Sequence, residues 1–213
     1  MPVQDSRRKF LKKGCLIAAA AGVTVCAGGA LAAAYQPKID LPTTVYGDQA
    51  VGRRALVAYA SKAGSTEEVA DKMGQILAQR NLKVDVRPVT SVTDLSPYQA
   101  VILGSAIRTG SLLPEAMTFI QQNQAALQQK SFSVFILCMT LATDNEANRK
   151  TVSSYLDPVR ALVKPASEGL FGGVMDLNRL KVFERLIILA MKVPQGDFRN
   201  WDQIDALAES VKA

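Results

Sequence analysis

The segment from Ser61 to Thr66, Ser-Lys-Ala-Gly-Ser-Thr, has the residue types and spacing to bind a phosphate group. It follows a short apolar run and leads into a sequence with helical periodicity. Gly64 allows a sharp turn in which successive backbone N–H groups point to one place. The helix expected from about Thr66 adds its unpaired N–H donors and the positive end of its dipole. Hydroxyl groups of the segment are further donors, and Lys62 is close by.

The same residues are also consistent with a helix cap that binds nothing. Ser65 and Glu68 have the spacing of a capping box, in which two side chains satisfy each other's backbone N–H groups. The segment lacks the glycine spacing of a dinucleotide fingerprint and the Gly-Lys-Ser/Thr ending of a nucleoside-triphosphate loop. The residues by themselves therefore leave phosphate binding and helix capping open.

Composition excludes several classes of chemistry. The 213 residues include no histidine, which excludes His-ligated zinc, acid–base catalysis by histidine and Ser-His-Asp triads. Three cysteines are too few for a disulfide scaffold or a four-thiolate metal site, and we expect no metal. Two of them lie in the first 34 residues. The third, Cys138, ends an apolar run, and we expect it to be an inert core residue.

The net charge of +6 is concentrated at the N-terminus. Residues 1–34 hold five cationic side chains and one acidic side chain, whereas the remaining residues hold 20 cationic and 18 acidic ones. Because the charge of this larger part is nearly balanced, we expect no nucleic-acid binding.

Residues 1–34 have the three parts of an export signal: a cationic start, an uncharged stretch from residue 14 and a small-residue end. The adjacent Arg7 and Arg8, followed by Lys-Phe-Leu, resemble twin-arginine signals, which carry folded proteins across the membrane. We therefore expect a protein exported across the cytoplasmic membrane to the periplasm or another extracytoplasmic space. The signal could be cleaved, or it could stay as an N-terminal anchor, since the uncharged run is about long enough to span a bilayer.

The rest of the chain alternates apolar runs with helical periodicity. Residues 35–52, with two prolines and two glycines, have the composition of a tether, and one domain is expected over 53–213. Strands are expected at 55–59, 83–89, 100–103, 132–139 and 169–174. Helices are expected at 66–80, 114–129, 146–163, 177–193 and 201–211. This alternation is typical of an α/β protein with a doubly wound parallel sheet, which binds ligands at the carboxyl ends of its strands.

Three segments in this order resemble a known flavin-binding family. The loop at 61–66, placed after a first strand, looks like the phosphate loop of flavodoxins. Together with Val-Ile-Leu-Gly-Ser-Ala-Ile-Arg-Thr-Gly at 101–110 and the late segment 183–203, it is similar to the menaquinone-dependent protoporphyrinogen oxidase family. The resemblance runs from about Ala55 to the C-terminus. It implies a five-stranded parallel sheet of flavodoxin type, with strand order 2-1-3-4-5, and FMN as the cofactor. The helix expected at 177–193 is an extra helix after strand 5.

The resemblance also implies where FMN would bind. Its phosphate would be wrapped by Ser61, Lys62, Ala63, Gly64, Ser65 and Thr66. One edge of the isoalloxazine ring would be approached, after the third strand, by Ser105, Ala106, Ile107, Arg108, Thr109 and Gly110. The other side would be approached, after the fourth strand, by Thr140, Leu141 and Ala142. No side chain stands out as a general acid or base, so none is assigned a catalytic role.

Three functions are consistent with these residues. The first, which we favour, is an FMN-dependent oxidoreductase linked to a quinone. The second is an electron carrier that docks on a redox protein without turning over a substrate. The third is a flavin-free interaction module. It is supported by Ala63, where flavodoxins typically have a hydroxyl residue, and by Thr109, where an aromatic side chain could stack on the flavin.

The segment Leu177–Val193 is more than a minimal fold of this kind needs. On a helical wheel, Lys181, Arg185 and Lys192 form one narrow stripe, and apolar residues cover about half of the circumference or more. A helix of this kind could lie at a membrane surface. The alternative is a core helix covered by the tether or by a second subunit.

Overall fold

The computed structural model describes residues 41–48, 52–180, 182–190 and 193–212, with the backbone alone for 182–184. The export signal expected at 1–34 and part of the tether lie outside the described residues, so export stays a prediction. Ile39–Asp176 and Pro194–Ala213 form one compact unit, and Leu177–Val193 belongs to another. Within the described residues, none of the helices is both long and apolar enough to cross a membrane.

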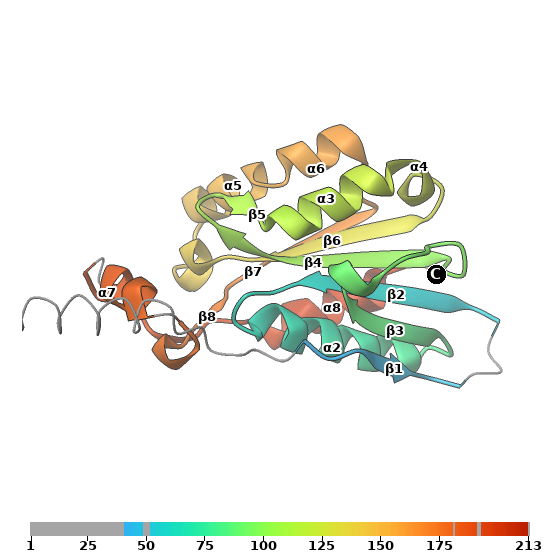
Figure 1. Cartoon of the computed structure of the whole chain (residues 1–213), viewed down its shortest axis with the longest axis horizontal. Helices are drawn as coiled ribbons and strands as arrows, with labels where there is room; N and C mark the ends of the chain where they lie inside the picture. The colour runs from blue at the N-terminus through green and yellow to red at the C-terminus, as the bar shows by residue number, and fades with distance from the viewer. Residues whose placement is uncertain (1–40, 49–51, 181, 191–192, 213) are drawn as a thin grey trace, which may run out of the picture. The chain divides into compact units, whose positions relative to one another are not determined.

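Five parallel strands form the centre of the sheet (Figure 1). They are β2 (Arg54–Ala60), β3 (Lys83–Pro88), β4 (Ala100–Arg108), β6 (Ser131–Leu137) and β7 (Ser167–Phe171). Their spatial order is β3-β2-β4-β6-β7, which corresponds to 2-1-3-4-5 in the sequence. The predicted α/β class and strand order are therefore confirmed. The central strands β2, from residue 55 onward, and β4, up to residue 103, are continuously apolar because helices cover both faces of a parallel sheet.

The two helical layers bury alternate residues of each strand (Figure 1). One layer contains α2 (Ser65–Ala78) and α8 (Trp201–Ser210). The other contains α3 (Pro114–Gln122), α4 (Gln124–Leu127), α5 (Glu146–Ser154) and α6 (Asp157–Leu162). On β2, Leu56 and Ala58 belong to the core on the α3 side, whereas Val57 and Tyr59 belong to the core on the α2 side.

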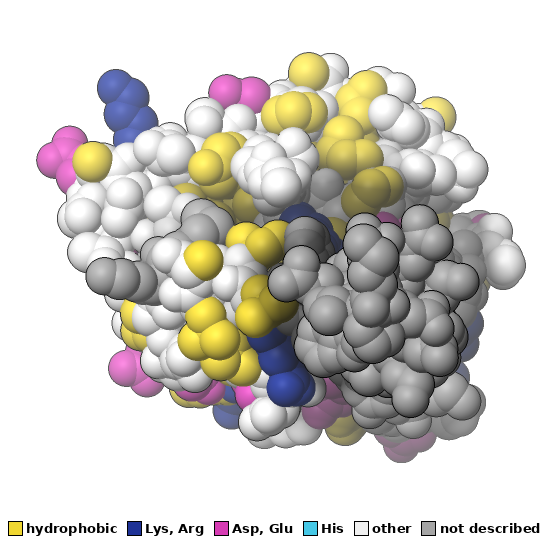
Figure 2. All heavy atoms as spheres, turned by 60° about the vertical axis from the view of Figure 1, so that its left-hand side comes forward, with side chains coloured by type: hydrophobic (Ala, Val, Ile, Leu, Met, Phe, Trp, Pro, Cys, Tyr) yellow, Lys and Arg dark blue, Asp and Glu magenta, His cyan; other side chains and the backbone are white. Residues whose placement is uncertain are grey.

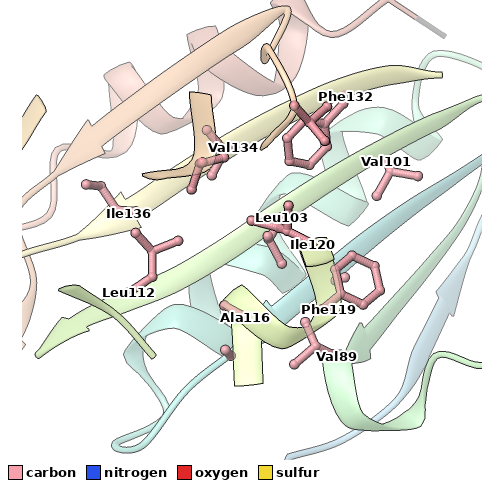
Figure 3. Packing of buried hydrophobic residues seen from close by; sticks show 14 of the residues in the cluster. Val89, Val101, Leu103, Leu112, Ala116, Phe119, Ile120, Phe132, Val134 and Ile136 are labelled. Carbon is pink, nitrogen blue, oxygen red and sulfur yellow. The ribbon is translucent and has the colours of Figure 1, made fainter. Parts of the chain in front are cut away.

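Aromatic and aliphatic side chains join α3 to the sheet (Figure 3). Phe119 and Ile120 of α3 lie in the same buried cluster as Leu103 of β4. Phe132 and Val134 of β6 continue this cluster. The packing holds β4 and β6 in place, and these two strands lead into predicted site segments.

Two helices expected from the periodicity are divided. Residues 114–129 form α3 and α4, because Asn123 leaves the helical conformation. Residues 146–163 form α5 and α6, and Pro158 lies in the first turn of α6, where its missing N–H is tolerated. After the fifth strand, a 3₁₀ turn (Leu177–Arg179) and α7 (Val182–Ala190) replace the single helix expected at 177–193. The extra helix is thus present but shorter than expected.

Part of the segment expected to be a tether belongs to the sheet. β1 (Thr44–Tyr46) pairs antiparallel with β3 at the edge. The Tyr46 hydroxyl donates to Asp71 Oδ1 on α2 at 2.6 Å, and the Tyr59 hydroxyl donates to the Pro42 carbonyl at 2.7 Å. The prediction of a tether over 35–52 is therefore wrong for this stretch, because three strand residues are too few to show a period.

Candidate functional site

The three predicted site segments leave adjacent strands at one edge of the sheet. Ala60, at the end of β2, pairs with Ser105 of β4, and Ala106 pairs with Leu137 at the end of β6. This is the carboxyl edge, where parallel α/β sheets bind ligands. Figure 2 brings this side of the molecule forward and shows apolar and cationic side chains on it.

Gly64 shapes the loop between β2 and α2. Its φ is +86°, in the left-handed region that favours glycine, and its backbone N–H donates to Ser61 Oγ at 3.0 Å. Gly64 is also the N-cap of α2, and no side chain caps this helix. Ser65 lies already inside the helix, so the capping box of Ser65 and Glu68 does not form. The structure thus excludes the Ser65–Glu68 capping box as the explanation of the motif.

The Thr66 hydroxyl is buried without a partner. Thr66 is fully buried, and its Oγ1 has no hydrogen-bond partner among the residues that the structure describes. Ser61 and Ser65 are buried as well. An unsatisfied buried hydroxyl is unfavourable and uncommon in native proteins. The loop therefore combines an unmet donor with an uncapped helix N-terminus, and a phosphate oxygen would satisfy both.

Two cations lie beside the loop, and the sequence pointed to one of them. Lys62 Nζ is 3.3 Å from the carboxylate of Glu115 on α3. Arg199, which no pattern in the sequence indicates, donates to Glu68 at 2.7 Å and to Asp197 at 2.7 Å, with its side chain 7% exposed. Burial lowers the pKa of the Arg199 guanidinium, but the hydrogen bonds to Asp197 and Glu68 outweigh burial and raise this pKa overall. Arg199 thus neutralises an acidic residue in the first turn of α2.

The segment expected as a loop after the third strand is mostly strand. β4 continues to Arg108 and pairs antiparallel with β5 (Ser111–Leu112), which makes a hairpin. Its turn consists of Thr109 and Gly110, with φ of 50° and 77°, as type I′ turns require. A β-branched residue at positive φ is an outlier, so the turn holds Thr109 under strain. The prediction of a loop is therefore wrong for 105–108, because residues 105 and 106 still pair with β2 and β6, and residues 107 and 108 pair with β5.

Two predicted site residues face the protein interior. Ser105 Oγ accepts a hydrogen bond from Leu113 N at 3.1 Å and donates to the Ala106 carbonyl at 2.9 Å. Leu141 is 4% exposed and belongs to the core on the α3 side. Both side chains position their segments. The predicted residues exposed at the hairpin are Arg108, Thr109 and Gly110, and those half-buried are Ala63, Ala106, Ile107, Thr140 and Ala142.

A pocket of about 550 Å³ adjoins the 3₁₀ helix η2 (Met139–Ala142) that follows β6. Asn148 holds η2 in place, since its side-chain amide donates to the carbonyls of Thr140 at 3.1 Å and Thr143 at 2.7 Å. The pocket shares Leu141 and Ala142 with the predicted site. The remaining lining residues come from the loop after η2, from β7 and the residue that follows it, and from the segment that leads into α8 and its first turn: Asp144, Leu170, Gly172, Phe198, Arg199, Asn200, Trp201, Asp202 and Gln203.

Residues 56–201 match the model of a protein family described as flavodoxin domain. The chain belongs to the flavodoxin domain family. Two curated relatives are both described as protoporphyrinogen IX dehydrogenase [quinone]. The one from Leishmania major is 25% identical over 158 residues, which cover 71% of this chain and 68% of the relative. The one from Escherichia coli K12 is 20% identical over 171 residues, which cover 74% of this chain and 94% of the relative.

Solved structures similar to this flavodoxin domain include a flavodoxin from Streptococcus pneumoniae TIGR4. That structure is 22% identical, covers 73% of this chain and 95% of its own, and has a TM-score of 0.46. A second is the apo form of an NADH:FMN oxidoreductase, which is 14% identical, covers 76% of this chain and 91% of its own, and has a TM-score of 0.49.

In this flavodoxin domain the phosphate-loop candidate, the β4–β5 hairpin and η2 lie at one edge of the sheet, as predicted. Arg199, which is distant in sequence, lies beside the loop. Within the described ranges, there is no group of three or more Cys, Asp or Glu side chains placed to hold a metal ion.

Proposed function

We propose that this flavodoxin domain binds FMN and acts as an oxidoreductase that passes electrons to a quinone. The observation that most directly supports flavin binding is the Thr66 hydroxyl, which is buried without a described partner. It lies beside the N-terminus of α2, which no side chain caps. Ser61–Thr66 would hold the phosphate, and bound FMN would supply the redox chemistry. The names of the two curated relatives support a quinone as the electron acceptor.

The other two segments would orient the ring and shield it from water. The Thr109-Gly110 turn and η2 are both fixed by hydrogen bonds within the protein, which limits their movement. Arg108, exposed at the end of β4, would place a positive charge near one edge of the ring. Such a charge favours added electron density on a bound flavin.

The purified full-length chain should be yellow and release close to one FMN per chain on denaturation. Thr66→Val removes the hydroxyl at nearly constant volume. It should raise the dissociation constant for FMN about tenfold, the loss of roughly one charge-assisted hydrogen bond. The flavin-free variant should be at least as stable as wild type, because an unsatisfied buried hydroxyl is gone. FMN titration and thermal unfolding measure the two effects.

Thr151→Val is the matched control, since the Thr151 hydroxyl is exposed and donates to the Ala147 carbonyl on α5. It should leave FMN affinity unchanged. A wild-type chain that stays colourless after incubation with excess FMN would contradict the flavin proposal and favour the interaction module.

The pocket beside η2 is our candidate site for the quinone ring. Its apolar lining includes Leu170 and Phe198, and it also includes Trp201, a residue that is 37% exposed. The Arg199 guanidinium lies 4.5 Å from the centroid of this ring and holds its orientation. Because Ala142 belongs both to the pocket and to the segment that would flank the flavin, a ring bound here would adjoin the cofactor.

Trp201→Ala should raise KM for a soluble naphthoquinone about three- to tenfold, with kcat and FMN content little changed, because ring stacking is lost. Trp201→Phe should restore most of the affinity. The measurement is reoxidation of the chemically reduced protein, compared with a non-quinone acceptor of matched potential. Equal rates with both acceptors, unaffected by Trp201→Ala, would instead indicate an electron carrier without a substrate site.

A further inference from the structure

Helix α7 presents an apolar face to solvent. Leu186 is 61% exposed, Ile187 42% and Leu189 53%. Among the described residues these are three of the five large apolar side chains that are exposed, and the other two, Val45 and Trp201, belong to β1 and α8. At 100° per residue, the three side chains and Ala190 span about 160° of the helix circumference. Soluble proteins rarely leave a contiguous face of this kind uncovered, so it indicates a contact surface.

Positive charge is concentrated in the same segment. Residues 177–193 hold four cationic side chains and one acidic side chain, a net charge of +3, whereas the rest of residues 35–213 has a net charge of −1. Arg185 is half-buried at the edge of the apolar face, where its Nε donates to the Leu180 carbonyl at 3.3 Å. An apolar face bordered by cations suits a helix that lies in the interface of a membrane with anionic lipids.

We infer that α7 docks this protein on an anionic lipid bilayer, with Leu186, Ile187 and Leu189 inserted among the acyl chains. Nine residues span about 14 Å, roughly half of a hydrocarbon core of about 30 Å, so α7 can lie in the interface and cannot cross it. A second copy of the chain is a less suitable occupant, because a two-fold contact would bring two segments of charge +3 together. The inference does not rest on flavin binding.

A fluorophore that reports the polarity of its immediate surroundings tests whether α7 enters the membrane. Leu189→Cys is made in the full chain with Cys15→Ser and Cys26→Ser, and the new thiol is labelled with the polarity-sensitive fluorophore NBD. The remaining Cys138 is buried. Val45→Cys in β1, where the native side chain is 46% exposed, is the matched control. Both proteins carry residues 1–34, so membrane binding by that segment does not distinguish the two positions.

Vesicles of phosphatidylglycerol and phosphatidylcholine should increase NBD emission at position 189 at least twofold and shift it to the blue, with little change at position 45. The response should weaken at high salt, because salt screens the cations, and be small with phosphatidylcholine alone. Leu186→Ser should reduce it without changing the circular dichroism spectrum. No response at 189, or equal responses at both positions or with both lipids, would overturn the inference. So would a lipid-independent response that grows with protein concentration, which would indicate a second copy.

Discussion

Gly64→Val is expected to weaken FMN binding at least tenfold. At φ of +86°, a residue with a side chain pays about 1–2 kcal/mol to keep the left-handed conformation, and a β-branched side chain is worse. The loop would leave this conformation, and the hydrogen bond from Gly64 N to Ser61 Oγ would break. The backbone N–H groups would then no longer point to one place. Titration of flavin-free protein with FMN, followed by quenching of flavin fluorescence, measures the effect.

Gly52→Val is the control, because a Cβ at Gly52 would meet no atom within 4 Å. It should leave both FMN affinity and stability close to wild type. If Gly64→Val bound FMN as tightly as wild type, the loop could not be the phosphate site, whatever cofactor the domain holds.

Asp85→Ala is expected to lower the free energy of unfolding by about 2 kcal/mol, less than for a fully buried ion pair because the Arg54 side chain is 33% exposed. Asp85 lies on β3 with 2% of its side chain exposed. Its Oδ2 accepts hydrogen bonds from Arg54 Nη2 at 2.9 Å and from the Tyr98 hydroxyl. Without the carboxylate, the guanidinium and the phenol both lose their acceptor. Chemical denaturation at neutral pH measures the change.

The same cluster predicts a dependence on alkaline pH. Burial, and then the hydrogen bond to Asp85, raise the pKa of Tyr98 from 10.0 to about 12. Between these values the folded protein binds more protons than the unfolded chain. The contribution of Tyr98 to the free energy of unfolding is therefore fully present below pH 10 and is lost as the pH rises towards 12. In Asp85→Ala this loss should be smaller. Asp94→Ala, at an exposed carboxylate, should change neither quantity appreciably; an equal effect would contradict the role given to burial.

Local features of the sequence determined much of this molecule. Apolar runs such as Ala100–Leu103 predicted buried parallel strands, because burial on both faces of a sheet removes any need for polar residues. The loop around Gly64 was also visible, since the turn and the helix start that form it are adjacent in sequence. The strand order and the positions of the ring-flanking segments came from resemblance to a family, and the order is confirmed.

The tertiary structure decided which polar groups are hydrogen-bonded within the protein and which have no partner among the described residues. Ser105 looked like a ligand contact, yet its hydroxyl accepts a hydrogen bond from the backbone N–H of Leu113, which β5 brings close. In the sequence the hydroxyls of Ser61, Ser65 and Thr66 looked equivalent. The structure buries that of Thr66 without a hydrogen-bond partner among the described residues. Arg199 reaches Glu68 across 131 positions of sequence. Pairs like these depend on strand order and packing. Residue periodicity records how deeply each position is buried and does not record which distant group it will meet.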